Sequence, residues 1–257
     1  MLILAIDTCD AQGSVALVDA LEQEQIVLAS AQHESGEDYS MWLLPAVQGV
    51  LSSAGCKLPD VAMYAASAGP GSFTGIRIAL TTVKAWNEVF GKPIAAVSRL
   101  EAFAIQAVGS PSLSGSGPRI IAAYCDAQRG QLYAAVYRRN GAVHERLAEE
   151  RVVSPAELIP WADEVSEGQP VAWVSPDPAS LAGDAAWQGR SAKGEVLEQV
   201  PRLVAPAVAR IAVQLAAQGR LVDALRLDAN YIRRPDAEVK WQGYSRPPQA
   251  AKESPNT

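Results

Sequence analysis

The sequence predicts a mixed-sheet α/β protein made of two similar lobes, and a repeated hairpin is the first observation behind this prediction. Each copy joins an apolar run, an aspartate, a polar turn and a second apolar run: residues 2–6, Asp7 and 15–18, then residues 120–124, Asp126 and 132–137. The tetrapeptide D-A-Q-G at 10–13 returns as D-A-Q-R-G at 126–130. Self-similarity at roughly 115 residues is too long for a solenoid and indicates two copies of one subdomain. The second observation is that strand–loop–helix patterns follow the hairpins, which places helices against the sheets.

Helices with recognisable ends follow the hairpins. Ser98 with Glu101, and Ser154 with Glu157, have the capping-box spacing, in which the hydroxyl accepts from an amide and the carboxylate reaches back. Residues 60–67 are apolar and bounded by proline and glycine, which predicts a buried strand. Helices are expected over residues 39–53, 75–90, 98–108 and 206–217, and another is expected to begin at Ser154–Pro155. Gly219 is the expected stop signal after the helix at 206–217.

A connector separates the two copies. Residues 109–118 have the glycine, serine and proline content of a solvated link. We therefore expect an N-terminal lobe at 1–108 and a C-terminal, degenerate second lobe at 117–241. Residues 245–257 offer nothing to bury and are expected to form a flexible tail.

Composition limits the classes of function. The chain has 257 residues, is 49% hydrophobic and carries a formal net charge of −6. A polyanion such as tRNA must then be met by a local basic patch or by a partner, because counterion release requires clustered lysine and arginine. The start lacks a basic segment before an apolar one, and no run approaches the length of a membrane span. The sequence therefore predicts a cytoplasmic protein without a membrane contact.

Cysteine and histidine usage argues against a metal site. Cys9, Cys56 and Cys125 are odd in number and widely spaced, which is typical of small buried thiols. His33 and His144 lie far apart, so they form no pair at helical spacing. The expectation is no metal and no cofactor.

The glycine-rich loop 69–75, G-P-G-S-F-T-G, leads into a helix. It lacks the lysine of a Walker loop, and Pro70 and Thr74 stand where a nucleophile elbow needs glycines. Two interpretations stay open. The loop is a tight turn capped by Ser72 or Thr74, or its free amides form an anion site in front of the helix dipole.

Aspartates end the first strands of both hairpins. Sheets of this kind occur in actin-like ATPases and their ribonuclease H-like relatives, where such carboxylates hold magnesium and phosphate. The expected fold class is accordingly the actin-like (ribonuclease H-like) two-lobe fold, with mixed sheets flanked by helices. Asp7 is followed by Thr8 and Cys9 instead of glycines, which favours a carboxylate that caps turn amides. An anion or nucleotide contact by Asp7, Ser72 and Thr74 remains the alternative.

Two helices carry more apolar surface than one core face requires. In 39–53 a predicted core stripe lies beside a strip of small residues under one indole: the stripe is Tyr39, Leu43, Leu44, Val47, Val50 and Leu51, and the strip is Trp42, Ala46, Gly49 and Ser53. In 75–90 the apolar arc covers more than half of the circumference. Such helices are either fully buried or shared with a partner.

Five stretches resemble the TsaB (YeaZ) family in order: I-L-A-I-D-T at 3–8, G-P-G-S-F-T-G-I-R-I at 69–78, P-I-A-A-V-S-R-L-E-A at 93–102, D-A-Q-R-G-Q-L-Y at 126–133 and N-Y-I-R-R at 230–234. The resemblance extends to about residue 241, and the second stretch is specific to that family. Two departures are Tyr39, at a polar and often histidine position, and D-A-Q at 126–128 in place of D-A-R.

The resemblance implies the two-lobe actin-like fold and a non-catalytic partner of the paralogous enzyme TsaD. With the ATPase TsaE, TsaD transfers a threonylcarbamoyl group to the adenosine beside the tRNA anticodon. The implied partners are a TsaD-like paralogue in a heterodimer, a TsaE-like ATPase and tRNA through the complex, and a second copy when the chain is alone. The expected TsaD contact is Gly75, Ile78, Ala79, Thr82 and Trp86 together with Trp42, Ala46, Gly49 and Ser53.

Two rival functions are weighed against this one. An actin-like small-molecule kinase or ATPase would need phosphate-binding glycines after Asp7 and a bound magnesium nucleotide. A peptidase would need a serine–histidine pair or a metal constellation, and neither is found in the sequence.

Overall fold

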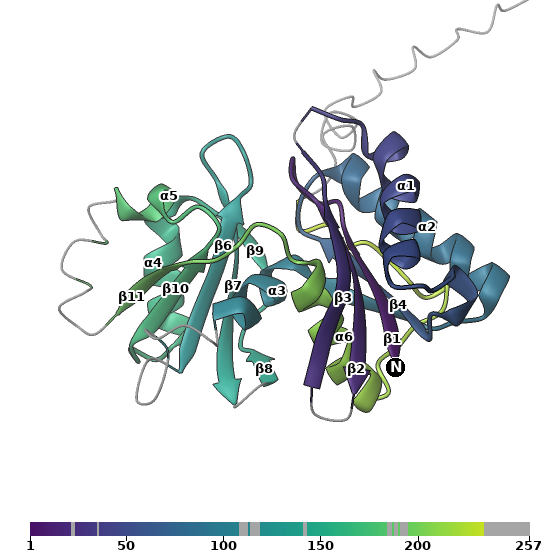
Figure 1. Cartoon of the computed structure of the whole chain (residues 1–257). Helices are drawn as coiled ribbons and strands as arrows, with labels where there is room; N and C mark the ends of the chain where they lie inside the picture. The colour runs from purple at the N-terminus through teal and green to yellow at the C-terminus, as the bar shows by residue number, and fades with distance from the viewer. Residues whose placement is uncertain are drawn as a thin grey trace, which may run out of the picture.

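The computed structural model describes residues 1–21, 24–34, 36–107, 113, 119–140, 143–183, 187, 190 and 195–233. Within them the chain forms two sheets covered by helices (Figure 1). The strands are β1 (Leu2–Asp7), β2 (Ser14–Leu21), β3 (Glu24–Gln32), β4 (Met63–Gly69), β5 (Ile94–Ser98), β6 (Ile120–Asp126), β7 (Leu132–Asn140), β8 (Val143–Arg146), β9 (Arg151–Val153), β10 (Val171–Ser175) and β11 (Val196–Gln199). The helices are α1 (Tyr39–Ser53), α2 (Phe73–Phe90), α3 (Arg99–Gln106), α4 (Pro155–Val165), α5 (Ala179–Ala182) and α6 (Ala205–Ala217), with a 3₁₀ turn at Leu58–Asp60.

The two sheets have the same topology. The first has the strand order β3-β2-β1-β4-β5, and the second repeats it as β8-β7-β6-β10-β11, with β9 beside β7. In the first sheet, β2 is antiparallel to both of its neighbours, β1 and β3, and β4 and β5 run parallel to β1. In the second sheet, β7 is likewise antiparallel to β6 and β8, and β10 and β11 run parallel to β6. The predicted mixed sheets flanked by helices are confirmed.

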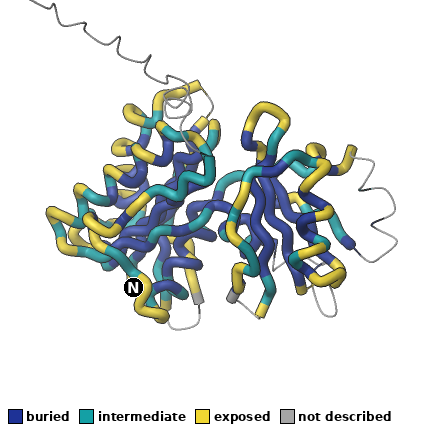
Figure 2. The backbone as a smooth tube through the Cα atoms, turned by 180° about the vertical axis from the view of Figure 1, so that it is seen from behind, coloured by how far each residue is buried: buried dark blue, intermediate teal, exposed yellow. Residues whose placement is uncertain are grey.

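The first strand is apolar throughout because both of its faces are covered. Ile3 and Ala5 point into a core shared with α6, while Leu4 and Ile6 point into the core beneath α1 and α2. Figure 2 shows the buried strands at the centre of each lobe and the exposed residues along the outer turns.

Helices α3 and α6 lie between the two sheets (Figure 1). α3 follows the last strand of the first sheet but packs on β6 and β7, whereas α6 follows the second sheet but packs on β1 and β2. One apolar core therefore joins the lobes. The division into 1–108 and 117–241 stays a prediction that fits the sheets better than it fits these two helices.

The helix ends show where local signals decided the structure. Ser72 Oγ accepts from the Gly75 amide at 3.3 Å, so α2 begins at Phe73, two residues earlier than expected. The box before α4 is present, since the Ser154 amide donates to Glu157 Oε2 at 2.8 Å. The box before α3 is only half formed: Ser98 Oγ accepts from the Glu101 amide at 3.5 Å, but its hydroxyl donates to a different carboxylate.

Other expectations need correction. The sequence patterns did not predict β3, β5, β8, β9, β10, β11 or α5. Leu113, in the expected solvated connector, is fully buried in the shared core, because a leucine in a polar linker is still drawn to apolar surface. The other connector residues, Val108 and the tail 245–257 lie outside the described residues. Cys9 and Cys125 are buried as predicted, whereas Cys56 is only half-buried. In the described part of the chain, no helix is both long and apolar enough to span a membrane.

Candidate functional site

The lobes enclose a cleft of about 680 Å³, called here the front cleft. Its walls come from the residues after β1 and β6, the loop residues 71–74, and the side chains of Arg99, Arg202 and Arg233. In a two-lobe fold of this type, the cleft between the sheets is where a ligand is expected first. Its chemistry depends on whether the strand-end aspartates are free.

Asp7 is not free, because Arg99 occupies it. Arg99 Nε donates to Asp7 Oδ2 at 3.3 Å, and the two side chains are 2% and 0% exposed. The other oxygen of Asp7 accepts from the Cys9 amide at 3.2 Å. Burial alone lowers the pKa of Arg99, but the carboxylate of Asp7 outweighs it and holds the pKa above its ordinary value. Both carboxylate oxygens thus have partners, and a permanent cation lies where an actin-like enzyme would need a metal ion.

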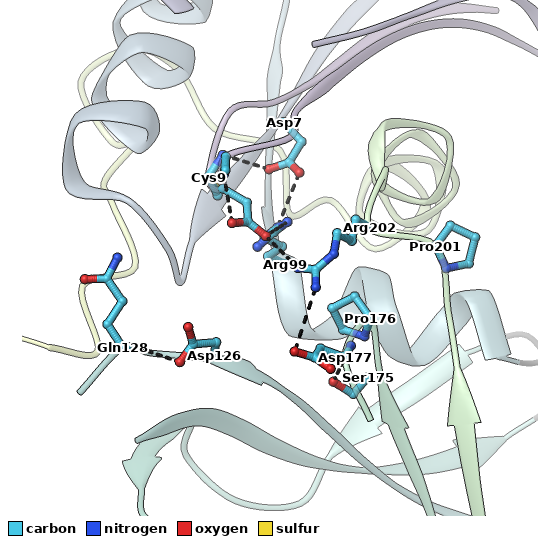
Figure 3. A network of polar contacts seen from close by, with 12 residues as sticks. Asp7, Cys9, Arg99, Asp126, Gln128, Ser175, Pro176, Asp177, Pro201 and Arg202 are labelled. Carbon is cyan, nitrogen blue, oxygen red and sulfur yellow. Dashed lines mark hydrogen bonds and ion pairs between the residues drawn. The ribbon is translucent and has the colours of Figure 1, made fainter. Parts of the chain in front are cut away.

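A second set of ion pairs crosses the front cleft (Figure 3). Asp10 Oδ2 accepts from Arg99 at 3.1 Å and lies 3.6 Å from Arg202. Arg202 also lies 4.0 Å from Asp177 in the second lobe. Burial by itself raises the pKa of Asp10, but Arg99 reverses this effect, so the pKa lies below its ordinary value. Asp126, at the end of β6, caps its own turn by accepting from the Gln128 amide at 2.7 Å.

The glycines of loop 69–75 serve close packing. A Cβ on Gly75 would lie 1.8 Å from the Thr8 carbonyl oxygen, and one on Gly71 would lie 2.2 Å from that of Cys9. Thr8 Oγ1 donates to the Gly75 carbonyl at 2.6 Å, and the Ser72 amide donates to the Cys9 carbonyl at 2.7 Å. The loop therefore lies against the β1–β2 turn, with the amides of residues 72 and 75 already bonded. This favours the capped turn over the anion site.

The cleft holds no activated thiol. Burial, followed by the charge of Asp7, raises the pKa of Cys9 well above its ordinary value, and burial raises that of Cys125 to about 12. The His33 ring lies between two backbone carbonyls, with Nδ1 3.2 Å from that of Ala11 and Nε2 2.8 Å from that of Glu37. The described residues contain no group of three His, Cys, Asp or Glu side chains arranged for a metal ion.

A second feature lies on the outer helices. A groove of about 510 Å³, called here the α1/α2 groove, is lined by α1 residues Tyr39, Ser40, Leu43 and Leu44 and by α2 residues Phe73, Thr74, Arg77, Ile78, Thr81 and Thr82. Three large apolar side chains on these helices face solvent: Met41 is 72% exposed, Leu44 56% and Val89 72%. Leu44 lines the groove itself, and large exposed apolar side chains on the same two helices are typical of an interaction surface.

The structure separates the residues predicted for the partner contact. Ile78 and Thr82 line the α1/α2 groove, whereas Gly75 and Ala79 are buried inside the chain and cannot touch a partner. Trp86 is half-buried against Tyr64, with ring centroids 5.3 Å apart.

The strip on α1 does not line the groove either. Trp42 and Ala46 pack onto the first-lobe core, and Trp42 meets His33 edge-on at 5.1 Å. Gly49 and Ser53 are exposed but lie outside the groove. The helical wheel placed these residues on a common face, but it could not say which side of α1 the sheet would cover.

Leu44 and Arg99 are functional candidates that sequence reasoning missed. Leu44 was assigned to the core stripe of α1 but is more than half exposed. Adjacent residues on a helix point about 100° apart, so one of the two lies at the edge of the buried arc; here it is Leu44, while its neighbour Leu43 is buried. Arg99 was also missed, because an arginine at the first turn of a helix has no sequence feature that marks it as buried.

Comparison with known proteins places this geometry in a family. The family model described as "TsaD: tRNA N6-adenosine threonylcarbamoyltransferase" matches residues 27–241. TsaB of Escherichia coli (strain K12), described as a tRNA threonylcarbamoyladenosine biosynthesis protein, is 30% identical over 248 residues, which cover 94% of this chain and 97% of the relative. The chain belongs to the TsaB (YeaZ) family. TsaB of Bacillus subtilis (strain 168) is 28% identical over 243 residues, covering 94% of this chain and 98% of that one.

A solved structure agrees in fold. YeaZ from Pseudomonas aeruginosa superposes with a TM-score of 0.66 at 24% identity, covering 90% of this chain and 99% of that one. At this identity the likeness concerns the fold alone, and it supports the predicted two-lobe fold class. A TsaD-type enzyme of Sphingopyxis alaskensis is 46% identical over only 63 residues, which are 24% of this chain and 18% of that enzyme. This chain is therefore similar in sequence to a TsaD-type enzyme over a short stretch.

Proposed function

We propose that this chain acts in tRNA threonylcarbamoyladenosine biosynthesis as the non-catalytic partner of a TsaD-like enzyme. Family membership supports the biosynthetic role and the partnership with TsaD. The finer proposal is that the α1/α2 groove, together with the exposed apolar side chains of the same two helices, forms the TsaD contact. Its partner residues are Met41, Leu44, Ile78, Thr82 and Val89, in place of the buried residues Gly75 and Ala79.

The observation that carries the proposal is that large apolar side chains on α1 and α2, the helices that form the groove, are exposed to solvent. Leu44 lines the groove and is 56% exposed, and Met41 lies three residues before it at 72%. A partner that covers these groups would gain a binding free energy of about 25 cal/mol for each Å² of apolar surface removed from water. Because TsaD-like enzymes share part of the sequence, a related pair of helices on the partner could pack against them in a pseudo-symmetric arrangement.

The front cleft supports a scaffold more than it supports the rival kinase. A kinase or ATPase needs a strand-end carboxylate that can bind a magnesium nucleotide. Here Asp7 is paired with the buried Arg99, and Gly71 and Gly75 pack against the β1–β2 turn. A net charge of −6 further favours tRNA contact through the assembled complex over contact by this chain alone. Contact with a TsaE-like ATPase and self-association of the free chain stay predictions.

Replacing one exposed leucine tests the proposed surface. The Leu44→Glu variant places a charge in the α1/α2 groove, and we expect it to lose co-purification with the cognate TsaD-like enzyme because the charge would be desolvated at the contact. Leu21→Glu is the matched control, since Leu21 is 53% exposed at the end of β2. That variant should bind normally, and both should unfold as cooperatively as the native chain.

Two outcomes would contradict the proposal. Retention of the complex by Leu44→Glu would show that the groove is not the contact. Titration of the isolated chain with magnesium ATP should give no heat of binding, whereas saturable binding lost on changing Asp7 to Asn would favour the kinase interpretation.

A further inference from the structure

A second cavity between the lobes, called here the Glu101 cavity, shares no lining residue with the front cleft or the α1/α2 groove. Its volume is about 700 Å³, within the usual range of small-molecule sites. One wall comes from the end of β5 and the start of α3, and the other from β7, β8 and residues 147–149. Residues 228–230 also line it, so a ligand here would contact segments of both lobes.

One wall of the cavity is held by a buried carboxylate. Glu150 is 3% exposed, and its oxygens accept from Ser98 Oγ at 2.5 Å, Tyr137 Oη at 3.3 Å and Asn230 Nδ2 at 2.6 Å. Three of the segments that line the cavity are thereby tied to one anion. A satisfied buried network of this kind rigidifies its surroundings, so the cavity has a fixed polar wall.

Two other polar side chains face the cavity without partners. His144 is only 8% exposed, and neither of its ring nitrogens has a hydrogen-bond partner. No hydrogen bond or ion pair among the described residues engages the carboxyl group of Glu101, which is partly buried and within electrostatic range of Arg220. Buried polar groups in native proteins are normally satisfied. His144 is therefore placed to meet a hydrogen-bonding ligand, and the carboxylate of Glu101 is accessible to a cationic group of the same ligand.

The charges around the cavity define that ligand. Glu101 lies partly buried inside, while the exposed Arg220 and Arg146 line the same cavity. Arg146 lies 3.6 Å from Glu150 and 3.7 Å from Glu149, beyond hydrogen-bond distance of either carboxylate. The negative charge within suits an ammonium group, and the arginines suit a carboxylate. We propose that the Glu101 cavity binds a small zwitterion of the free amino-acid class, with its ammonium on Glu101, its carboxylate toward Arg146 and Arg220, and a hydrogen bond to His144.

Proton linkage gives the proposal a signature. Burial raises the pKa of Glu101 to about 7, with the charge of Glu150 adding to it and Arg220 and Arg146 opposing it. An ammonium ligand favours the ionised carboxylate, so binding should strengthen as pH rises through about 7 and should release a proton below it. The other titratable or charged groups facing the cavity are His144, Tyr137, Glu149 and Asp228.

The experiment screens the free L-amino acids for a rise in melting temperature of the full-length chain, followed by calorimetric titration of those that bind. We expect at least one to bind, with its N-acetyl and methyl-ester derivatives failing because each lacks one pole. Glu101→Gln should weaken binding by at least about tenfold, the equivalent of one pKa unit. Glu164→Gln is the matched control, since Glu164 is exposed on α4 and lines neither this cavity nor the front cleft, and it should change affinity little.

Several results would overturn the proposal. These are the absence of binding by any free amino acid, equal binding of the capped derivatives, or native affinity in Glu101→Gln. If that variant unfolds abnormally, Arg220→Gln provides the second test and should also weaken binding. Both variants should still bind the TsaD-like enzyme, because the cavity is separate from the α1/α2 groove.

Discussion

Replacing Arg99 with methionine should destabilise the protein strongly, because it leaves the carboxylate of Asp7 buried without a cation. The two groups lie 3.3 Å apart and are 2% and 0% exposed. At that distance the attraction is about 5 kcal/mol for an effective dielectric of 20 and about 1.3 kcal/mol in water. Breaking a buried pair by removing one partner typically costs about 3–5 kcal/mol, and we expect Arg99→Met to lower the free energy of unfolding by that amount.

The matched control is a pair with the same separation on the surface. Arg138 and Glu145 are also 3.3 Å apart, but they are 41% and 56% exposed. Arg138→Met should therefore cost less than about 1 kcal/mol. Urea unfolding followed by tryptophan fluorescence measures both variants.

A double variant isolates the buried charge itself. Asp7→Asn with Arg99→Met should recover more than half of the stability lost in the single variant, because the uncompensated carboxylate is gone. The reasoning would be refuted if Arg99→Met cost no more than Arg138→Met, or if the double variant were no more stable than Arg99→Met.

Two further predictions concern the loop and the Glu101 cavity. Gly75→Ala should lower the free energy of unfolding by about 2–4 kcal/mol, since the new Cβ would lie 1.8 Å from the Thr8 carbonyl oxygen. A Cβ on Gly49 would have nothing within 4 Å, so Gly49→Ala should raise the free energy of unfolding by up to about 1 kcal/mol. Equal urea midpoints for the two variants would contradict this. In the pH dependence, burial raises the pKa of Glu101 to about 7 and lowers that of His144 to about 4. The stability that Glu101 contributes to the folded state is fully present below pH 4.5 and is lost as pH rises through 7. The stability that His144 contributes is present above pH 6.5 and is lost as pH falls through 4. These two effects on stability should nearly cancel in the native chain. The Glu101→Gln variant should instead lose about 3 kcal/mol of unfolding free energy between pH 6.5 and 4. A flat profile of urea stability against pH for that variant would exclude the explanation.

Local patterns in the sequence predicted the elements whose signals are local. The apolar runs before Asp7 and Asp126 became β1 and β6, and the cap at Ser72 and the box at Ser154 became helix starts. β3 and β10 were missed although they contain the apolar runs 26–29 and 171–174, because a short apolar run by itself does not distinguish a strand from a buried helix segment. Leu44 was misplaced because helical periodicity fixes a direction around the axis but not the element that will cover it.

The sequence by itself determined the repeated hairpins, the two mixed sheets and the family, because strand periodicity, turn residues and the stretch 69–78 are local properties of the chain. Only the tertiary structure decided the candidate sites. It brought Arg99 onto Asp7 across 92 positions, turned Leu44 outward while burying Gly75 and Ala79, and grouped Glu101 with His144 in one cavity. The physical reason is that burial and charge pairing depend on which segments pack together, and long-range packing is not encoded in any single stretch of residues.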